Sequence, residues 1–324
     1  MHRRQFLQLA LLAVVGLRPV GALAQLTEQP IRIIFPFAPG GSGDALARIV
    51  ADRMRAALGR PVLVENRTGG AGRVGVMAVK SAVPDGSTML ITPIAPMAVY
   101  QHTYRSLGYD PINDFLAISQ LATFDFGLAV RSGTIPTDSL KQFVAWVKAD
   151  PARAAFGTPA TGDLTHFLGI LFGRAAGLDL RHVPYRGSAA AVADLVAGHI
   201  PFVLAPISDL AEMHRSGRVR ILASSGKERS RFAPNEPTFR EAGYDIEGSS
   251  WYGAFVPAKT PAVTIERFGA IMAGAVRTPE VSARLHALGL APTGTTATEL
   301  AAIQRADSER WASAVKLSGF TAED

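Results

Sequence analysis

The sequence has 324 residues, no cysteine and a formal net charge of +6. The lack of cysteine excludes disulfides, thiolate metal sites, a cysteine nucleophile and a lipoprotein anchor. Lysine and arginine are scattered among aspartate and glutamate, so no basic block is long enough to bind nucleic acid. The length suits about two domains of ordinary size.

Residues 1–24 have the pattern of a signal peptide. Arg3 and Arg4 form a basic start, residues 6–17 are an apolar run too short to span a membrane stably, and small residues precede a cleavage site near Ala24/Gln25. The Arg-Arg-x-Phe-Leu order also resembles a twin-arginine signal, so the export route stays open. Cleavage would remove three arginines and leave a charge of +3. We expect a soluble periplasmic protein; a retained N-terminal anchor helix is the alternative.

From residue 31 onward, strand-like and helix-like segments alternate. Such alternation is typical of an α/β fold with mainly parallel sheets that carry helices on both faces. The expected strands are 31–37, 62–66, 88–92, 127–130, 155–158, 180–183, 202–204 and 220–224, and the expected helices are 44–58, 74–82, 138–149, 163–176, 188–197 and 208–216.

The C-terminal part has a different pattern. After a strand-like segment at 250–257, three helical segments follow without a strand between them. Because helices need a sheet to cover, we expect this tail to return to the first domain. The predicted organisation is a discontinuous domain 1 (25–124 and 249–324), a domain 2 (125–248), and crossings near 124–126 and 247–250. The three helical segments are 261–277, 279–288 and 296–317.

Residues 35–50, FPFAPGGSGDALARIV, pass from a strand through a glycine turn into a helix. A helix N-terminus has unpaired N–H groups and a partial positive charge, so such a turn often binds an anion. The turn lacks the Gly-x-x-x-x-Gly-Lys-Ser/Thr order of a nucleotide-binding loop. GAGRVG at 70–75 matches a dinucleotide fingerprint, but no acidic residue follows about twenty positions later to hold a ribose. We therefore interpret 69–75 as a tight turn and expect no cofactor.

Catalytic motifs are also missing. Ser42 has Asp44 where a nucleophile elbow needs its second glycine, and no His-Glu-x-x-His occurs. The histidines are spread singly, without the spacing of metal ligands. We predict that the chain is not an enzyme and binds no metal. An exported hydrolase assembled from distant residues, acting on a small acid, is the alternative.

Capture of an anion without a reaction needs only turns of this kind. Comparable strand-to-helix turns occur at 37–44, 158–166 and 183–189. Two of them from different domains, facing each other across a cleft, would hold a small anion when the domains close. The pattern therefore favours a two-domain receptor.

Seven stretches carry a family resemblance, in chain order: PIRIIFPFAPGGSGDALAR (30–48), LGRPVLVENRTGGAGRVG (58–75), PDGSTML (84–90), SLGYDPINDF (106–115), HVPYRGSAAAVADLVAGHI (182–200), SSWYGAFVPAKTP (249–261) and the helical tail. The sequence resembles the Bug family, the periplasmic receptors of tripartite tricarboxylate transporters. The resemblance implies a two-domain Venus-flytrap fold, a ligand in the interdomain cleft and delivery to membrane transporter subunits. It also implies a small carboxylate ligand: a di- or tricarboxylate, an acidic amino acid, or an aromatic acid such as nicotinate.

The resemblance further implies two ligand loops. In the first loop, backbone amides and the Ser42 hydroxyl would meet a carboxylate. Phe37 would flank the ligand or pack in the core, and Asp44 would cap the helix or order the loop rather than touch an anion. The first loop comprises Phe37, Ala38, Gly40, Gly41, Ser42 and Asp44.

The second loop comprises Thr158, Thr161, Gly162 and Asp163, where the family usually shows Ser-x-Gly-x-Gly-Thr. The threonine hydroxyls would remain hydrogen-bond donors. Asp163 departs from the pattern, and it would either cap the helix or select a ligand with a positive or hydrogen-donating group. Tyr185 in the third turn is a further candidate.

Two other departures make the cleft wall less polar. Thr92 and Ala95 belong to a Thr-Pro-Ile-Ala-Pro segment where the family often has Gly-Thr-Ser-type residues, and Ala205 stands where an Asp is common. We infer a ligand with a more apolar or aromatic body than an amino acid. The sequence thus predicts a monomeric periplasmic carboxylate receptor; whether it feeds a transporter or a sensor stays open.

Overall fold

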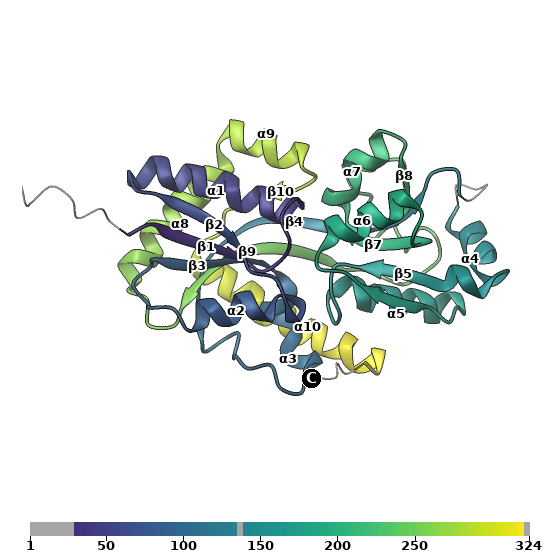
Figure 1. Ribbon diagram of the computed structural model, residues 1–324, viewed down its shortest axis with the longest axis horizontal. Coiled ribbons are helices and arrows are strands. Elements are labelled where there is room, and N and C mark those ends of the chain that lie inside the picture. The colour runs from purple at the N-terminus through teal and green to yellow at the C-terminus, as the bar shows by residue number, and fades with distance from the viewer. Residues whose placement is uncertain (1–28, 135–138, 321–324) are drawn as a thin grey trace, which may run out of the picture.

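The computed structural model describes residues 29–134 and 139–320 (Figure 1). The predicted signal peptide, 1–24, lies outside these residues, so its cleavage and export route stay predictions. Within the two described ranges, no helix is both long enough and apolar enough to cross a membrane.

In the described residues, ten strands form a mixed sheet in the order β2-β1-β3-β9-β4-β7-β5-β6, with β8 and β10 each paired to β4. The pairs within β1–β3 and within β5–β7 are parallel, as expected of strands joined by crossover helices, whereas β4 and β9 run antiparallel to their neighbours. The strands are β1 (Ile31–Phe35), β2 (Val62–Asn66), β3 (Thr88–Pro93), β4 (Phe115–Arg131), β5 (Ala155–Thr158), β6 (Arg181–Pro184), β7 (Phe202–Pro206), β8 (Val219–Ser224), β9 (Ser249–Pro257) and β10 (Ala291–Pro292).

Strand β4 is long and takes part in both halves of the sheet. Its residues 115–125 pair with β9, and residues 126–131 pair with β7 and β8. We call the part built on β1, β2, β3, β9, β10 and 115–125 the first lobe, and the part built on β5 to β8 and 126–131 the second lobe (Figure 1). The predicted domain boundaries themselves stay predictions.

Helices cover both faces of each lobe (Figure 1). In the first lobe, α1, α8 and α9 lie on one face, and α2, α3 and α10 on the other. In the second lobe, α6 and α7 lie opposite α5. The helices are α1 (Ser42–Leu58), α2 (Arg73–Lys80), α3 (Tyr100–Thr103), α4 (Leu140–Lys148), α5 (Leu164–Ala176), α6 (Ser188–Ala197), α7 (Ile207–Arg215), α8 (Ala262–Arg277), α9 (Pro279–Ala287) and α10 (Ala297–Ser318), with short helical turns η1 (Gly70–Gly72), η2 (Ala95–Val99) and η3 (Pro151–Ala154).

Helix α1 shows how the sequence positions the first loop. Its buried residues include Leu46, Ile49, Val50 and Met54, which recur at the three- and four-residue spacing that places them on one face against the sheet. The helix ends at Gly59, which adopts the left-handed conformation (φ 67°) that glycine accepts without strain. The N-terminus of α1 is thereby fixed at the edge of the first lobe that faces the second (Figure 1).

The confirmed α/β architecture differs in three places from the expected elements. Residues 94–103 are helical across η2 and α3, although the sequence indicated no element there. Strand β4 begins at Phe115, whereas only 127–130 were expected as a strand. The tail contains the two-residue strand β10, which pairs with β4, although no strand was expected between its helices. The tail helices α8 and α10 pack on β4.

Candidate functional site

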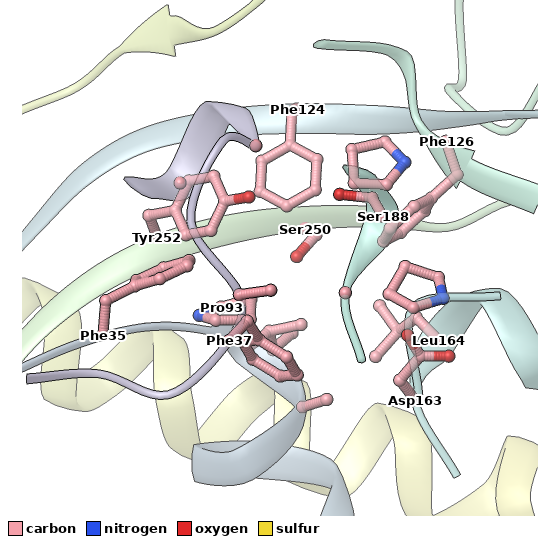
Figure 2. Close-up of a pocket in the computed structure, with 18 residues that line it drawn as sticks. Phe35, Phe37, Pro93, Phe124, Phe126, Asp163, Leu164, Ser188, Ser250 and Tyr252 are labelled. Carbon is pink, nitrogen blue, oxygen red and sulfur yellow. The ribbon is translucent and has the colours of Figure 1, made fainter. Parts of the chain in front are cut away.

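A small cavity lies between the lobes, where β4 passes from one to the other (Figure 2). About 60 Å³ is open to the centres of water molecules, which corresponds to roughly four to six of them. None of the residues that line it is a lysine, arginine or histidine. The lining residues are Phe35, Phe37, Ala38, Gly41, Gly43, Pro93, Ile94, Ala95, Phe124, Phe126, Pro159, Asp163, Leu164, Gly187, Ser188, Pro206, Ser250 and Tyr252.

Five aromatic rings line the cavity, four from the first lobe and Phe126 from the second (Figure 2). Phe124 stacks on Tyr252 with a centroid distance of 4.7 Å and meets Phe126 edge-on at 5.5 Å. Phe35 meets Phe37 edge-on at 6.0 Å. These rings come from β1, β4 and β9 and the loop after β1, so neighbouring strands fix their positions. The cavity therefore has a rigid apolar wall.

Few polar side chains reach this cavity. Ser250 is 2% exposed, and its hydroxyl has no hydrogen-bond partner within the described residues. Ser188 donates its hydroxyl to Asp209 Oδ2. Asp163 is the only lining residue with an ionisable carboxyl group.

The N-terminus of α1 already binds a carboxylate group of the protein itself, that of Asp209. The backbone N–H of Ser42 donates to Asp209 Oδ1 at 2.6 Å, and the Ser42 hydroxyl lies 2.8 Å from the hydroxyl of Ser208. Both partners are on α7 of the second lobe. Burial raises the pKa of Asp209, although hydrogen bonds from Ser188 and Ser42 act in the opposite direction. In this structure Asp209 occupies the position where the sequence predicted a ligand carboxylate.

Asp44 stabilises the glycine turn from within. Its carboxylate accepts hydrogen bonds from the Gly40 N–H at 3.2 Å and from Asn66 Nδ2 at 2.9 Å, and it pairs with Arg48 at 3.0 Å. Burial opposes its ionisation, but these hydrogen bonds outweigh the burial and lower the pKa of Asp44. Asp44 therefore orders the loop, as the sequence suggested, and does not line the cavity.

Asp163 performs one of its two predicted roles. It is the N-cap of α5, where Oδ1 accepts from the His166 N–H at 2.9 Å and from the Thr165 hydroxyl at 2.7 Å. It also lines the cavity. Burial raises the pKa of Asp163 to about 7, against the lowering effect of these hydrogen bonds.

Two other second-loop residues, Thr158 and Thr161, form their hydrogen bonds with groups of the protein. Thr158 donates its hydroxyl to the Ala160 carbonyl at 2.9 Å and contacts His182 Nε2 at 2.6 Å. The Thr161 carbonyl accepts from the Tyr104 hydroxyl of the first lobe at 3.1 Å. These residues shape the loop and connect the lobes.

Five of the predicted site residues line the cavity together: Phe37, Ala38, Gly41, Ala95 and Asp163. The structure does not bring the other nine to it, namely Gly40, Ser42, Asp44, Thr92, Thr158, Thr161, Gly162, Tyr185 and Ala205.

Three of these nine have clear positions elsewhere. Thr92 and Ala205 are fully buried in β3 and β7. Tyr185 donates its hydroxyl to Asp194 at 2.9 Å and lies in an adjacent hollow, beside Arg186. That hollow shares Phe37 and Pro159 with the cavity. Ligand contact by any of the fourteen predicted residues stays a prediction.

Sequence reasoning missed most of the aromatic wall. Phe35, Phe124, Phe126 and Tyr252 lie in apolar strand segments, where an aromatic residue is normally taken for core packing. Ser250 lies in the family-like stretch SSWYGAF but was not singled out. The one available signal was the predicted crossing at 124–126, because ligands of two-domain proteins bind where the domains meet.

Two α/β lobes that share a strand, with a small cavity between them, match the architecture of periplasmic binding proteins. The family model described as "Tripartite tricarboxylate transporter family receptor" matches residues 46–320, and the chain belongs to this family. Among curated relatives, the protein BugT of Bordetella pertussis is 32% identical over 318 residues, which cover 95% of this chain and 97% of BugT.

Solved structures agree with this assignment. The periplasmic binding protein BugD is 27% identical, with a TM-score of 0.86 and coverage of 91% of this chain and 99% of BugD. Rpa4515 of R. palustris with adipate is 26% identical, with a TM-score of 0.86 and coverage of 92% and 99%. MatC from Rhodopseudomonas palustris with bound malate is 26% identical, with a TM-score of 0.83 and coverage of 88% and 98%. The family resemblance and the fold class inferred from sequence are thereby confirmed.

Proposed function

We propose that this protein is an exported periplasmic receptor that captures a small carboxylate between its lobes and delivers it to the membrane subunits of a tripartite tricarboxylate-type transporter. The observation that carries the proposal is the cavity at the junction of the lobes, lined by residues from both of them. The related proteins with adipate and with malate support a carboxylate as the ligand. The receptor acts as a monomer, with a signal peptide that is removed on export.

The residues that line the cavity limit the kinds of ligand that it can bind. Five aromatic rings favour an apolar or aromatic body. A ligand carboxylate meets no cationic side chain there, so hydroxyl and backbone N–H groups must bind it. We therefore propose a carboxylate with a ring or an aliphatic chain rather than an amino acid.

Ligand entry requires the lobes to separate. The contacts that join them next to the cavity include Ser42 with Asp209, the Ala38 N–H with the Arg186 carbonyl at 3.3 Å, and Tyr104 with Thr161. These three contacts are polar, whereas on the other side of the sheet Phe320, which follows α10, packs edge-on against His166 and Phe167 of α5 at 4.6 and 5.8 Å. Polar contacts of this kind suit reversible closure. Residues 124–126 of β4 are the proposed hinge.

The rival function is an exported enzyme that acts on a small acid in the same cavity. The test is native mass spectrometry of protein purified from the periplasm of its expression host, followed by calorimetry with adipate, malate and benzoate. Tight 1:1 binding with the acid recovered unchanged is the expected result. Chemical conversion of the bound acid would support the enzyme instead.

A further inference from the structure

Ser250 differs from every other polar side chain around the cavity. It lies at the start of β9, directly opposite Phe124 in the β4–β9 pairing, and is 2% exposed. Its hydroxyl has no hydrogen-bond partner in the described part of the chain. Figure 2 shows this hydroxyl directed into the cavity, between Tyr252 and Leu164.

A buried hydroxyl without a partner costs free energy, because it has lost the hydrogen bonds that it makes in water. Nearly all buried polar groups in proteins have a partner. A hydroxyl held in the wall of a binding cavity is therefore suited to a partner that arrives with the ligand.

The other hydroxyl groups of the cavity already have partners within the protein. The Ser188 hydroxyl donates to Asp209, and Asp209 in turn accepts from the N–H of Ser42. Oδ1 of Asp163 accepts from its own helix, α5. The Tyr252 hydroxyl lies 3.5 Å from the Ser42 hydroxyl. Ser250 is thus the side chain with a free hydroxyl for a ligand among the described lining residues.

Two more lining residues, Ile94 and Ala95, follow β3 directly in the chain. The register of β3 with β9 sets Pro93 opposite Tyr252, so the chain that leaves β3 passes next to the first residues of β9. A carboxylate at Ser250 would therefore lie between β9 and the end of β3.

We propose that Ser250 anchors the bound acid by donating its hydroxyl hydrogen to a carboxylate oxygen. The inference rests on the proposed receptor function and deepens it: the carboxylate lies against β9 and the end of β3, and not at the glycine turn, where Asp209 already occupies the helix N-terminus. The apolar body of the acid then lies against the aromatic wall.

The test compares Ser250→Ala with Ser224→Ala. Ser224 is the matched control, because its hydroxyl is also buried and without a partner in the described residues, yet it lies on β8 outside the cavity. Isothermal titration with adipate, malate and benzoate measures the affinity of each variant. We expect Ser250→Ala to weaken the acid that wild type binds best by about tenfold or more, the range for a hydrogen bond to a charged group. Ser224→Ala should stay within about twofold of wild type.

Thermal melting of the ligand-free variants separates binding from folding. Because each substitution removes an unpartnered hydroxyl, both variants should melt at or slightly above the wild-type temperature. Unchanged or tighter binding by Ser250→Ala would overturn the anchor while leaving the receptor function intact. An equal loss in Ser224→Ala would overturn it as well. Wild type that binds none of the three acids would contradict the receptor proposal and the anchor together.

Discussion

Gly41 lies where the glycine turn of the first lobe approaches the second lobe. A Cβ atom placed there would meet the Ser188 hydroxyl at 3.3 Å and the Asp209 carboxylate at 3.6 Å, both in the second lobe. Its backbone conformation (φ −84°) accepts any residue, so a side chain would obstruct closure without straining the turn.

Gly41→Val is therefore expected to abolish carboxylate binding while the protein stays folded. Calorimetry with the best-bound acid measures the first effect and circular dichroism the second. Gly274→Val is the control, because a Cβ at Gly274 on α8 meets nothing within 4 Å. If Gly41→Val bound the acid with full affinity, the first loop would not be part of the binding site.

Asp163 should make ligand binding depend on pH, because it lines the cavity. Since its pKa is about 7, the carboxyl group is neutral at lower pH and repels a carboxylate ligand once it ionises. Affinity for benzoate should fall as pH rises from 6 to 8, by at most about tenfold per pH unit. The neighbouring His166 and His182, with pKa values of about 4 and 3, do not titrate in this range.

Asp163→Asn should bind benzoate with nearly the same affinity at pH 6 and pH 8, since asparagine keeps the helix cap but does not ionise. Asp150→Asn is the matched control: Asp150 caps η3 in the same way, through the Ala152 N–H, away from the cavity. If Asp163→Asn kept the wild-type pH dependence, the effect would have another source.

At the scale of elements, α5 and β6 are joined by a stacked pair of histidines. The rings of His166 and His182 lie 3.7 Å apart, His166 Nδ1 accepts from the Gly162 N–H, and His182 contacts Thr158. Burial lowers the pKa of His166 to about 4, and burial together with the charge of its neighbour lowers that of His182 to about 3. Both rings are therefore neutral in the folded protein over most of the pH range in which they would be charged when unfolded.

This pair should make the fold sensitive to acid. Between about pH 6.5 and pH 4 the unfolded chain binds two protons that the folded histidines do not, so stability falls as pH falls. Asp163 acts in the opposite sense, because its raised pKa gives stability that is lost as pH rises toward 7. Among these three groups alone, two protons favour unfolding and one opposes it. Thermal melting of His182→Gln from pH 4 to pH 7 should show a weaker pH dependence than wild type; a steeper one would contradict this origin.

Most elements could be predicted from the sequence, because hydrophobic periodicity and glycine or proline stops are local signals. The helical stretch 94–103 was missed because Pro93 and Pro96 normally indicate a loop. The first part of β4 was missed because its alternation is broken by register shifts against β9 between 117 and 122. No local signal marked either feature.

From the sequence, cavity-lining residues could be predicted mainly in the turns between a strand and a helix. Gly41 and Asp163 lie in strand-to-helix turns, and both reach the cavity. The partner of Ser42 is Asp209, 167 residues further along the chain, and no spacing rule connects two such positions. Ser250 gains its significance from a missing hydrogen bond, which only the folded structure reveals.

At the scale of the whole molecule, Asp209 of the second lobe accepts a hydrogen bond from the Ser42 N–H of the first. Asp209→Ala would remove this acceptor. Loss of this charge-assisted bond should shift the ligand-free protein about tenfold or more toward open forms. Small-angle scattering should then give a larger radius of gyration without ligand.

Glu212→Ala provides the comparison for that experiment. Glu212 lies on the same helix, α7, but its ion-pair partner is Arg215 of that helix, so its loss leaves the contacts between the lobes unchanged. A radius of gyration in Asp209→Ala equal to that of Glu212→Ala would show that Asp209 does not hold the lobes together.

Strand β4 gives the molecule one further property. Phe124 and Phe126 are two positions apart, so both side chains leave the same face of the strand, and both line the cavity. They also lie where β4 leaves its pairing with β9 and begins its pairing with β7. If the proposed function holds, the surface that a bound acid touches is thus part of the proposed hinge. An acid of the right size would then stiffen this hinge, and occupancy of the cavity could be followed by measuring the angle between the lobes.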